Sequence, residues 1–308
     1  MLSINHIEIE IPKNRIAIMD LEKETQLSKP MLSVYSMIYG LKTIPVLEQG
    51  DLQSFITIPL KKLLDYCHDK TKIKYLIFVH TTAILHPFGY SLLTILKEKY
   101  KLNSAILFEM TMQKCASYFK ALEILTVLLK NNPDYYAIVI TGEVAFTPLL
   151  RVVPGSSIVG DAATASLLSC DGFDNQMLSI SNHLMSGYAK GIYLSDSEIK
   201  TFDSKFIQSM LEIICDALNK AKITLDKINL ILPHNVNLPT WRKIAIALNF
   251  SIEKIYLDNI PKYGHTFCSD HIINLHSALL ENRLKKGDYY LMTGCGMGFY
   301  LAAAVFIY

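Results

Sequence analysis

The stretch AILFEMTMQKCASYFKALEILTVLLK, residues 105–130, combines a strand, a short polar turn and a helix. Residues 105–110 are an apolar run of strand length, and residues 119–130 repeat apolar positions at helical spacing. Cys115 lies between them, at the start of the predicted helix. Helix N-termini expose unpaired backbone N–H groups and the positive end of the helix dipole, which stabilise a thiolate and a developing oxyanion. The stretch therefore predicts an α/β unit with a nucleophilic cysteine, although a free cysteine also serves as a small buried apolar residue.

The same alternation of strands and helices runs through the whole chain. In the first half, we predict strands at 4–11, 41–47, 75–80, 105–110, 137–141 and 163–170, and helices at 60–69, 91–100 and 115–130. In the second half, we predict strands at 176–181, 228–232, 254–257, 289–293 and 299–307, and helices at 205–221, 239–249 and 268–285. The halves look like copies of one β/α plan, with sheets enclosed by helix layers. The turn-rich residues 171–174 place the boundary between residues 1–170 and 171–308.

Composition restricts the class of protein. Hydrophobic residues make up 51% of the 308 positions, which suits sheets that are covered on both faces. The balance of 30 basic to 28 acidic residues, without a basic stripe, argues against a nucleic-acid partner. No apolar run reaches the roughly 18 residues of a membrane-spanning helix, and the first residues lack the features of a signal peptide. The six cysteines form no CxxC pair, which favours reduced thiols. We therefore expect a cytoplasmic protein that binds neither nucleic acid nor membrane.

Two histidines directly follow predicted strands in the second half. His234 lies in PHNVN, residues 233–237, and His265 lies in YGHT, residues 263–266. Each histidine alone also fits a structural or loop position. Together with Cys115 they place a thiol and two imidazoles at strand-to-helix corners, and these groups can hold an acyl thioester and polarise a second carbonyl. Cys115, His234 and His265 are therefore the predicted catalytic residues.

Other motifs at strand ends have weaker interpretations. The glycines of GCGMG, residues 294–298, permit either a close backbone approach to a ligand or a tight turn, and GDAA, residues 160–163, is read as structural. His265, Cys268 and His271 have metal-binding residue types. Their three-residue spacing aligns ligands only in part on a helix, and no fourth ligand is evident. We predict no metal.

Seven motifs, in order along nearly the whole chain, resemble the β-ketoacyl-acyl carrier protein synthase III family of the thiolase superfamily. They are HTT at 80–82, HPF at 86–88, KCAS at 114–117, GDAA at 160–163, PHNVNL at 233–238, GHT at 264–266 and GMG at 296–298. The resemblance implies a thiolase-like α/β fold of two pseudo-symmetric halves in α-β-α-β-α layers, and a homodimer. It also implies that Cys115 is acylated by a CoA or carrier-protein thioester, which is a substrate, so that no separate cofactor is needed.

The resemblance also implies roles for individual residues. Cys115 would be the nucleophile, with His234 as its first partner, and both His234 and His265 would bind the thioester carbonyl and shuttle the proton. The backbone amides of Cys115 and Met297 would form the oxyanion hole. By resemblance, Phe88 would shape the acyl pocket of the partner subunit; the alternative is that it packs into its own core. The predicted substrate-binding residues are Asn237, Phe88, Gly296 and Gly298.

The chain departs from the family pattern at several positions. His265 stands where the family has asparagine, although thiolases and elongating ketosynthases carry histidine at that corner. Pro239 replaces the arginine of the usual carrier-protein contact, and Asn235 replaces a glutamine. Residues 28–39 lack the tryptophan and arginine that commonly hold the CoA adenine. These departures weaken an assignment to the initiation of housekeeping fatty-acid synthesis.

The leading hypothesis is a condensing enzyme that loads an acyl group on Cys115 and passes it to a malonyl-type carbanion. The pathway would be fatty-acid or secondary-metabolite biosynthesis, and the donor an acyl-CoA or an acyl carrier protein. The closest alternative is an acyltransferase with a hydroxyl or amine acceptor, for which one imidazole removes the acceptor's proton. A third hypothesis is a weakly catalytic partner subunit of a heteromeric synthase. Acyl chain length, donor and acceptor stay open.

Overall fold

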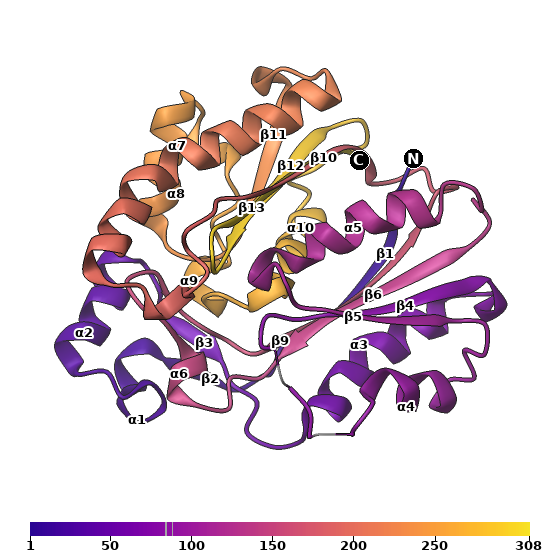
Figure 1. Ribbon diagram of the computed structural model, residues 1–308, viewed down its shortest axis with the longest axis horizontal. Helices are drawn as coiled ribbons and strands as arrows, with labels where there is room; N and C mark the ends of the chain where they lie inside the picture. Colours follow the sequence, from indigo (N-terminus) through magenta and orange to yellow (C-terminus); the bar gives the residue numbers. More distant parts are fainter. Residues whose placement is uncertain (84, 88) are drawn as a thin grey trace.

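The computed structural model describes residues 1–83, 85–87 and 89–308. Its centre is a nine-stranded sheet in the order β11-β12-β13-β10-β1-β9-β6-β4-β5 (Figure 1). These strands are β1 (Ser3–Glu10), β4 (Ile73–Val79), β5 (Ile106–Met110), β6 (Tyr136–Glu143), β9 (Ala162–Ser169), β10 (Gln176–Leu184), β11 (Ile228–Pro233), β12 (Tyr289–Gly296) and β13 (Tyr300–Ile307). Two short pairs lie outside it, namely β2 (Arg15–Ala17) with β3 (Thr43–Pro45), and β7 (Val152–Val153) with β8 (Ser157–Ile158).

The two parts of this sheet repeat one arrangement. In the first part β9 is antiparallel to β1 and β6, and β4 is parallel to β6 and β5. In the second part β13 is antiparallel to β10 and β12, and β11 is parallel to β12. A single parallel bridge between Ile231 and Ile255 occupies the position that β5 has in the first part. Cys115 and His265 therefore follow equivalent edges of the two halves.

Helices form three layers around the two halves of the sheet. The longer helices are α3 (Leu52–Tyr66), α4 (Leu92–Lys99), α5 (Ser117–Leu128), α7 (Asp196–Ala221), α8 (Leu238–Leu248) and α10 (Asp270–Leu280). The short ones are α1 (Glu22–Thr25), α2 (Lys29–Ser33), α6 (Pro148–Arg151) and α9 (Ile260–Tyr263). Figure 1 shows α5 and α10 between the two half-sheets, α3 and α4 outside the first, and α7 and α8 outside the second. The predicted α-β-α-β-α layering is confirmed.

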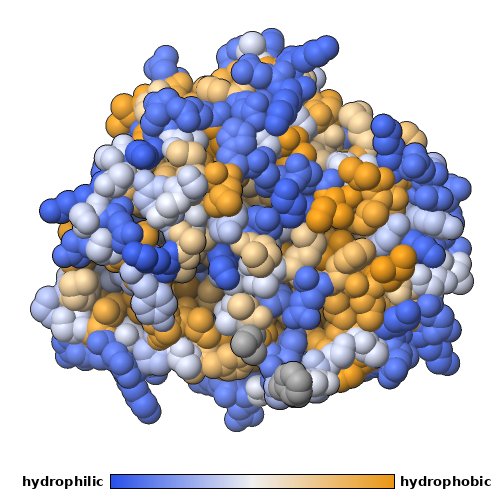
Figure 2. Space-filling model, viewed as in Figure 1, coloured by the Kyte–Doolittle hydropathy of each residue, from blue (hydrophilic) through white to orange (hydrophobic). Residues whose placement is uncertain are grey.

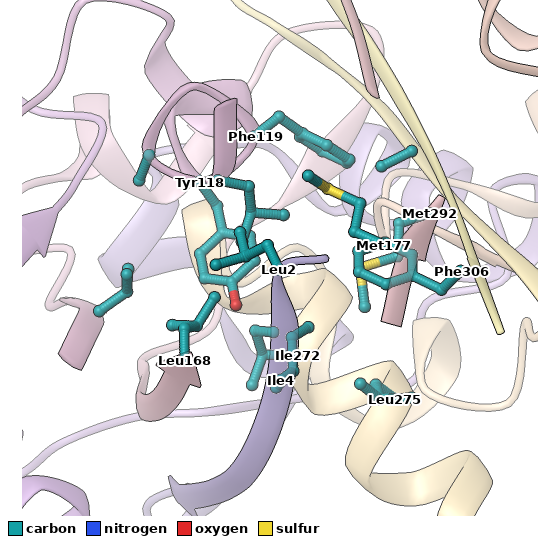
Figure 3. Packing of buried hydrophobic residues seen from close by; sticks show 14 of the residues in the cluster. Leu2, Ile4, Tyr118, Phe119, Leu168, Met177, Ile272, Leu275, Met292 and Phe306 are labelled. Atoms are coloured by element: carbon teal, nitrogen blue, oxygen red, sulfur yellow. The ribbon is translucent and has the colours of Figure 1, made fainter. Parts of the chain in front are cut away.

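The central layer holds the largest apolar core. Tyr118 and Phe119 of α5 belong to the same core as Ile272 of α10 and residues of both half-sheets (Figure 3). Tyr118, Phe119 and Ile272 are fully buried, and the burial of a side chain such as Phe119 or Ile272 contributes roughly 1.5–3 kcal/mol. Because α5 and α10 begin with the predicted catalytic motifs, their packing against each other holds Cys115 and His265 at one end of the same core.

Several predicted boundaries differ from the structure. The predicted strand 254–257 is wrong, because the chain forms a 3-10 turn at Ile252–Lys254 and then only the bridge at Ile255. The helix predicted at 60–69 is α3, which begins earlier because the Asp51 side chain accepts a hydrogen bond from Ser54 N and caps it. Similarly, α7 begins before residue 205, at a capping box made by Ser195 and Glu198. Across the described residues, no helix is both long and apolar enough to cross a membrane.

Candidate active site

A cavity of about 260 Å³ is lined by all the predicted site residues that the structure describes. Its lining includes the three predicted catalytic residues, Cys115, His234 and His265, and also Asn237, Gly296, Met297 and Gly298. Phe88 lies outside the described residues. Residues from both halves of the chain thus meet around one thiol, as the strand-to-helix corners predict.

Cys115 lies in a tight turn at the entrance to α5. The turn is a 3-10 segment, Lys114–Ala116, and Lys114 has a φ of 52°, in the left-handed region that is unfavourable for a side chain of this size. The end of β12 packs against it so closely that a Cβ on Gly296 would lie 1.9 Å from the Gln113 carbonyl oxygen. Only glycine fits this approach, which brings the loop with Met297 next to Cys115.

His265 connects Cys115 to a buried carboxylate. His265 Nε2 lies 3.1 Å from Cys115 Sγ, and His265 Nδ1 lies 2.6 Å from Asp270 Oδ2. Asp270 also accepts hydrogen bonds from the backbone N–H groups of Thr266 and Asn235 and from the Thr266 hydroxyl. A carboxylate that accepts this many bonds stays ionised, so Nδ1 of His265 carries a proton and Nε2 faces the thiol. The arrangement is a thiol–imidazole–carboxylate triad.

The charges of this triad stabilise one another. Burial disfavours the imidazolium form of His265, but the charge of Asp270 and the adjacent Cys115 thiol outweigh it and raise the His265 pKa well above its ordinary value. Burial likewise opposes ionisation of Asp270, but the charge of His265 and the hydrogen bonds hold the Asp270 pKa below its ordinary value. Because an adjacent imidazolium favours the thiolate form of cysteine, the triad can supply a nucleophile.

His234 has a different protonation state. Its Nδ1 accepts a hydrogen bond from Cys295 N at 2.8 Å, so the proton of the neutral ring is on Nε2. Burial, followed by the neighbouring His265 and His271, lowers the His234 pKa to about 3. His234 Nε2 is buried and has no hydrogen-bond partner among the residues that the structure describes. His234 thus carries an N–H group without a partner among the described residues and is one of the residues that line the cavity, and the ring centroids of His234 and His265 are 6.3 Å apart.

Three polar residues of the site were not predicted from the sequence. Asp270 is the first, and the sequence signal for it is an acidic residue at the very start of a predicted helix, five positions after His265. The other two are Thr81 and Glu143. The Thr81 hydroxyl lies 3.6 Å from Cys115 Sγ, and Glu143 accepts hydrogen bonds from the backbone N–H groups of Thr81 and Thr82. No local pattern indicates Glu143, because it lies more than sixty residues from Thr81 in the chain.

The remaining predicted residues have structural contacts. The Asn237 side chain lines the cavity but also accepts from Thr240 N and donates to Ser156 O, so it caps α8. His271 Nε2 lies 3.0 Å from Thr293 O. Within residues 1–83, 85–87 and 89–308, no group of three His, Cys, Asp or Glu side chains could hold a metal ion. Asp161, read as structural, forms a buried ion pair with Arg151.

Sequence comparisons find relatives that are named β-ketoacyl-[acyl-carrier-protein] synthase III. Residues 218–308 match the family model described as 3-oxoacyl-[acyl-carrier-protein (ACP)] synthase III C terminal. A β-ketoacyl-[acyl-carrier-protein] synthase III of Aquifex aeolicus is 35% identical over 102 residues, which are 33% of each chain. The protein of the same name from Blochmanniella floridana is 26% identical over 255 residues, which cover 77% of this chain and 78% of the relative. The first match thus covers 33% of the relative's length, and the second covers 78%.

Solved structures share the whole fold. ChlB3, described as an acyltransferase, has a TM-score of 0.87 at 20% identity, covering 99% of this chain and 97% of that protein. The 3-oxoacyl-[acyl-carrier-protein] synthase III of Aquifex aeolicus has a TM-score of 0.82 at 21% identity, with both chains covered completely. These likenesses confirm the predicted thiolase-like fold.

Proposed function

We propose that this chain, a β-ketoacyl-acyl carrier protein synthase III-like protein of the thiolase superfamily, transfers an acyl group from one substrate to another through Cys115. The observation that carries the proposal is the contact of Cys115 with His265, which Asp270 orients and charges. This arrangement is what a thioester-dependent acyl transfer requires of a protein.

The first half-reaction would acylate the thiol. The Cys115 thiolate attacks the carbonyl carbon of an acyl-CoA or acyl carrier protein thioester. Backbone amides of Cys115 and Met297 are proposed to stabilise the negative charge on the carbonyl oxygen. As the tetrahedral adduct collapses, the bond to the leaving sulfur breaks, and the imidazolium of His265 gives its proton to that sulfur. Cys115 then holds the acyl group and His265 is neutral.

The first candidate acceptor is a malonyl-type carbanion, which would make the protein a condensing enzyme. The names of the relatives support it, and so does His234, which lines the cavity as a neutral ring whose Nε2–H has no partner among the described residues. This N–H would hold the thioester oxygen of the malonyl unit while CO₂ leaves. The carbanion would then attack the acyl carbon, so that a C–C bond forms while the bond to Cys115 Sγ breaks and the thiolate leaves.

The second candidate acceptor is a hydroxyl or an amine, and the Asp270 contact favours it. Once His265 is neutral, its remaining proton is on Nδ1, where Asp270 accepts the hydrogen bond. Nε2 then carries a lone pair beside the acylated sulfur. This nitrogen would remove the proton from an incoming O–H or N–H group as that group attacks the acyl carbon, and the bond to Cys115 Sγ would break with the Cys115 thiolate as the leaving group.

We further propose a homodimer that forms through the β5 edge. β5 ends the nine-stranded sheet, and apolar side chains on it and on α5 are exposed, among them Ile106, Phe108 and Val127. Figure 2 shows apolar surface gathered over this part of the molecule, right of centre. An apolar edge strand is a ready template for pairing with a second copy. The alternative of a weakly catalytic partner subunit is disfavoured by the assembled triad.

The test is intact-protein mass spectrometry after incubation with acyl-CoA and acyl carrier protein thioesters. The wild type and Cys215→Ala, which changes an exposed thiol, should gain one acyl group, and Cys115→Ala should gain none. Discharge of the adduct by malonyl thioester with release of CO₂ would identify the condensing enzyme. Discharge by alcohols or amines would identify the acyltransferase, and no adduct with any donor would overturn the proposal.

A further inference from the structure

Thr81 follows β4, and its backbone is held on both sides. Its N–H donates to Glu143 Oε2 at 2.5 Å, and its C=O accepts from the Thr111 hydroxyl at 2.9 Å. The other oxygen of Glu143 accepts from Thr82 N at 2.9 Å. Because β4 is parallel to both β5 and β6, the three strands end at the same edge of the sheet and bring these groups together. Thr81 is therefore held in one backbone position.

The Thr81 hydroxyl faces two sulfur atoms. Its oxygen lies 3.6 Å from Cys115 Sγ and 3.5 Å from Cys268 Sγ. Thr81 is buried and is not among the residues that line the cavity, so it contacts the proposed nucleophile without taking space from a substrate. A hydroxyl has a single proton and donates to one acceptor at a time.

The charge on each sulfur decides which one receives this proton. Burial raises the pKa of Cys268 well above its ordinary value, so Cys268 stays an uncharged thiol. Its S–H group has an acceptor in Lys114 O, at 3.1 Å. Cys115 becomes negatively charged during the proposed transfer, when its thiol proton passes to His265. Hydrogen bonds to a charged acceptor are roughly twice as strong as those between neutral groups, so the Thr81 hydroxyl donates to the Cys115 thiolate.

We propose that Thr81 is a catalytic residue, whose hydroxyl stabilises the negative charge on Cys115 Sγ whenever the thiolate is present. This inference rests on the proposed acyl transfer and adds a residue to its mechanism. The two halves of the chain then contribute similar groups. The second half supplies His265, which the carboxylate of Asp270 orients, and the first half supplies Thr81, whose backbone is held by Glu143.

The two half-reactions depend on this hydrogen bond to different extents. During loading, the bond favours the thiolate but lowers its nucleophilicity, and these effects cancel in part. During transfer to the acceptor, the bond from the acyl carbon to Cys115 Sγ breaks and the negative charge returns to the sulfur. In the condensing route His265 is then neutral and has no proton on Nε2, so Thr81 provides the hydrogen bond to the leaving thiolate. Loss of the hydroxyl should therefore slow transfer more than loading.

The test compares Thr81→Val, which removes the hydroxyl and keeps the branched shape, with Thr81→Ser, which keeps the hydroxyl. Thr164→Val is the matched control, since Thr164 is a buried threonine whose hydroxyl bonds to that of Thr141 at 2.8 Å. Acetyl-pantetheine loads Cys115, hydroxylamine serves as a small acceptor, and mass spectrometry follows both steps in single turnovers. Thermal melting confirms that each variant is folded, and Thr81→Ala replaces Thr81→Val if the latter is not.

In Thr81→Val, the acetyl group should leave Cys115 for hydroxylamine roughly 10- to 150-fold more slowly than in wild type, the factor expected for one hydrogen bond to a charged group. Loading should slow by less. Thr81→Ser and Thr164→Val should stay within a few-fold of wild type in both steps. Transfer by Thr81→Val within about threefold of wild type would overturn the assignment and leave the proposed function intact. An equal loss in Thr81→Ser would also overturn it, because the effect would then follow from packing.

Failure of the proposed function has a different signature. If no donor acylates Cys115 in any variant, the hydrogen bond is measured without catalysis, from iodoacetamide alkylation of Cys115 between pH 5 and 10. Peptide mapping separates Cys115 from Cys295, the other thiol that lines the cavity. Thr81→Val should need a higher pH than wild type for the same rate, and Thr81→Ser should not. Identical pH profiles in wild type and Thr81→Val would refute the inference.

Discussion

Replacing Asp270 by asparagine tests the triad with a change of one atom. In the protein, Asp270 Oδ2 accepts from His265 Nδ1 at 2.6 Å, and both side chains are almost fully buried. In Asp270→Asn, the donors from Thr266 can keep the Asn Oδ1 in place, which directs the amide NH₂ towards His265. The ring of His265 then moves its proton to Nε2, facing Cys115, and can no longer take the thiol proton.

The expected magnitude follows from the role of His265. A positioned imidazole that transfers a proton contributes roughly 100- to 10,000-fold to a rate, and Asp270→Asn leaves His265 in the tautomer that cannot take the thiol proton. Acylation of Cys115 should therefore be slower by about this factor. The loss should appear in the acylation step itself, since Asp270 is not among the residues that line the cavity.

The assay combines quenched-flow mass spectrometry of acyl-Cys115 with iodoacetamide alkylation between pH 5 and 10. Burial lowers the His265 pKa, but the charge of Asp270 outweighs it and holds this pKa well above its ordinary value, so wild type should keep an imidazolium beside Cys115 at neutral pH. Asp270→Asn removes this charge, so the pH profile of alkylation should change. Asp161→Asn is the matched control, since Asp161 is a buried carboxylate paired with Arg151. It should lower stability and leave the pH profile of alkylation unchanged.

Loading by Asp270→Asn within about threefold of wild type, less than 1 kcal/mol, would refute the reasoning. It would mean that Asp270 stabilises the fold without orienting His265. A matching loss in Asp161→Asn would point to the same conclusion, because the effect would then follow from the loss of any buried carboxylate.

Three further predictions concern pH, packing and assembly. His234 has a pKa of about 3 in the fold and near 6.5 when unfolded, so the unfolded chain binds more protons between these values and stability rises with pH there. In His234→Gln, urea denaturation at pH 5 and 6 should show that the free energy of unfolding rises less steeply with pH, by about 1.4 kcal/mol per pH unit. An unchanged pH dependence would contradict the prediction. Gly296→Ala should lower stability by about 1–3 kcal/mol and slow acylation, because its Cβ would lie 1.9 Å from the Gln113 carbonyl oxygen; an unchanged melting temperature would show that the turn can give way. On the β5 edge, Phe108→Lys should produce a monomer in sedimentation velocity. The control Phe173→Lys changes a residue that is 89% exposed and should not produce a monomer. A monomeric wild type would exclude the dimer.

Periodicity and breakers were sufficient to predict most elements that carry the site. The apolar runs of β4, β5, β6 and β9 and the helical spacing of α5 are local properties, so they can be read without knowledge of contacts. The prediction failed at residues 254–257, where the strand-like run pairs through a single bridge before the chain turns into α9. Whether such a run extends into a strand depends on the neighbouring β11, which local pattern does not reveal.

Local patterns in the chain indicate which chemistry is available: a thiol at a helix start, an imidazole directly after β11, and a second imidazole after an apolar run that forms only a single bridge. How these groups are paired depends on the tertiary structure. The resemblance made His234 the first partner of Cys115, whereas the contact is made by His265, 150 positions away. Asp270 likewise gains its role from its contacts with His265, Thr266 and Asn235, which the fold of the second half brings together. Such pairings depend on distances across a close-packed core, which no local spacing of residues encodes.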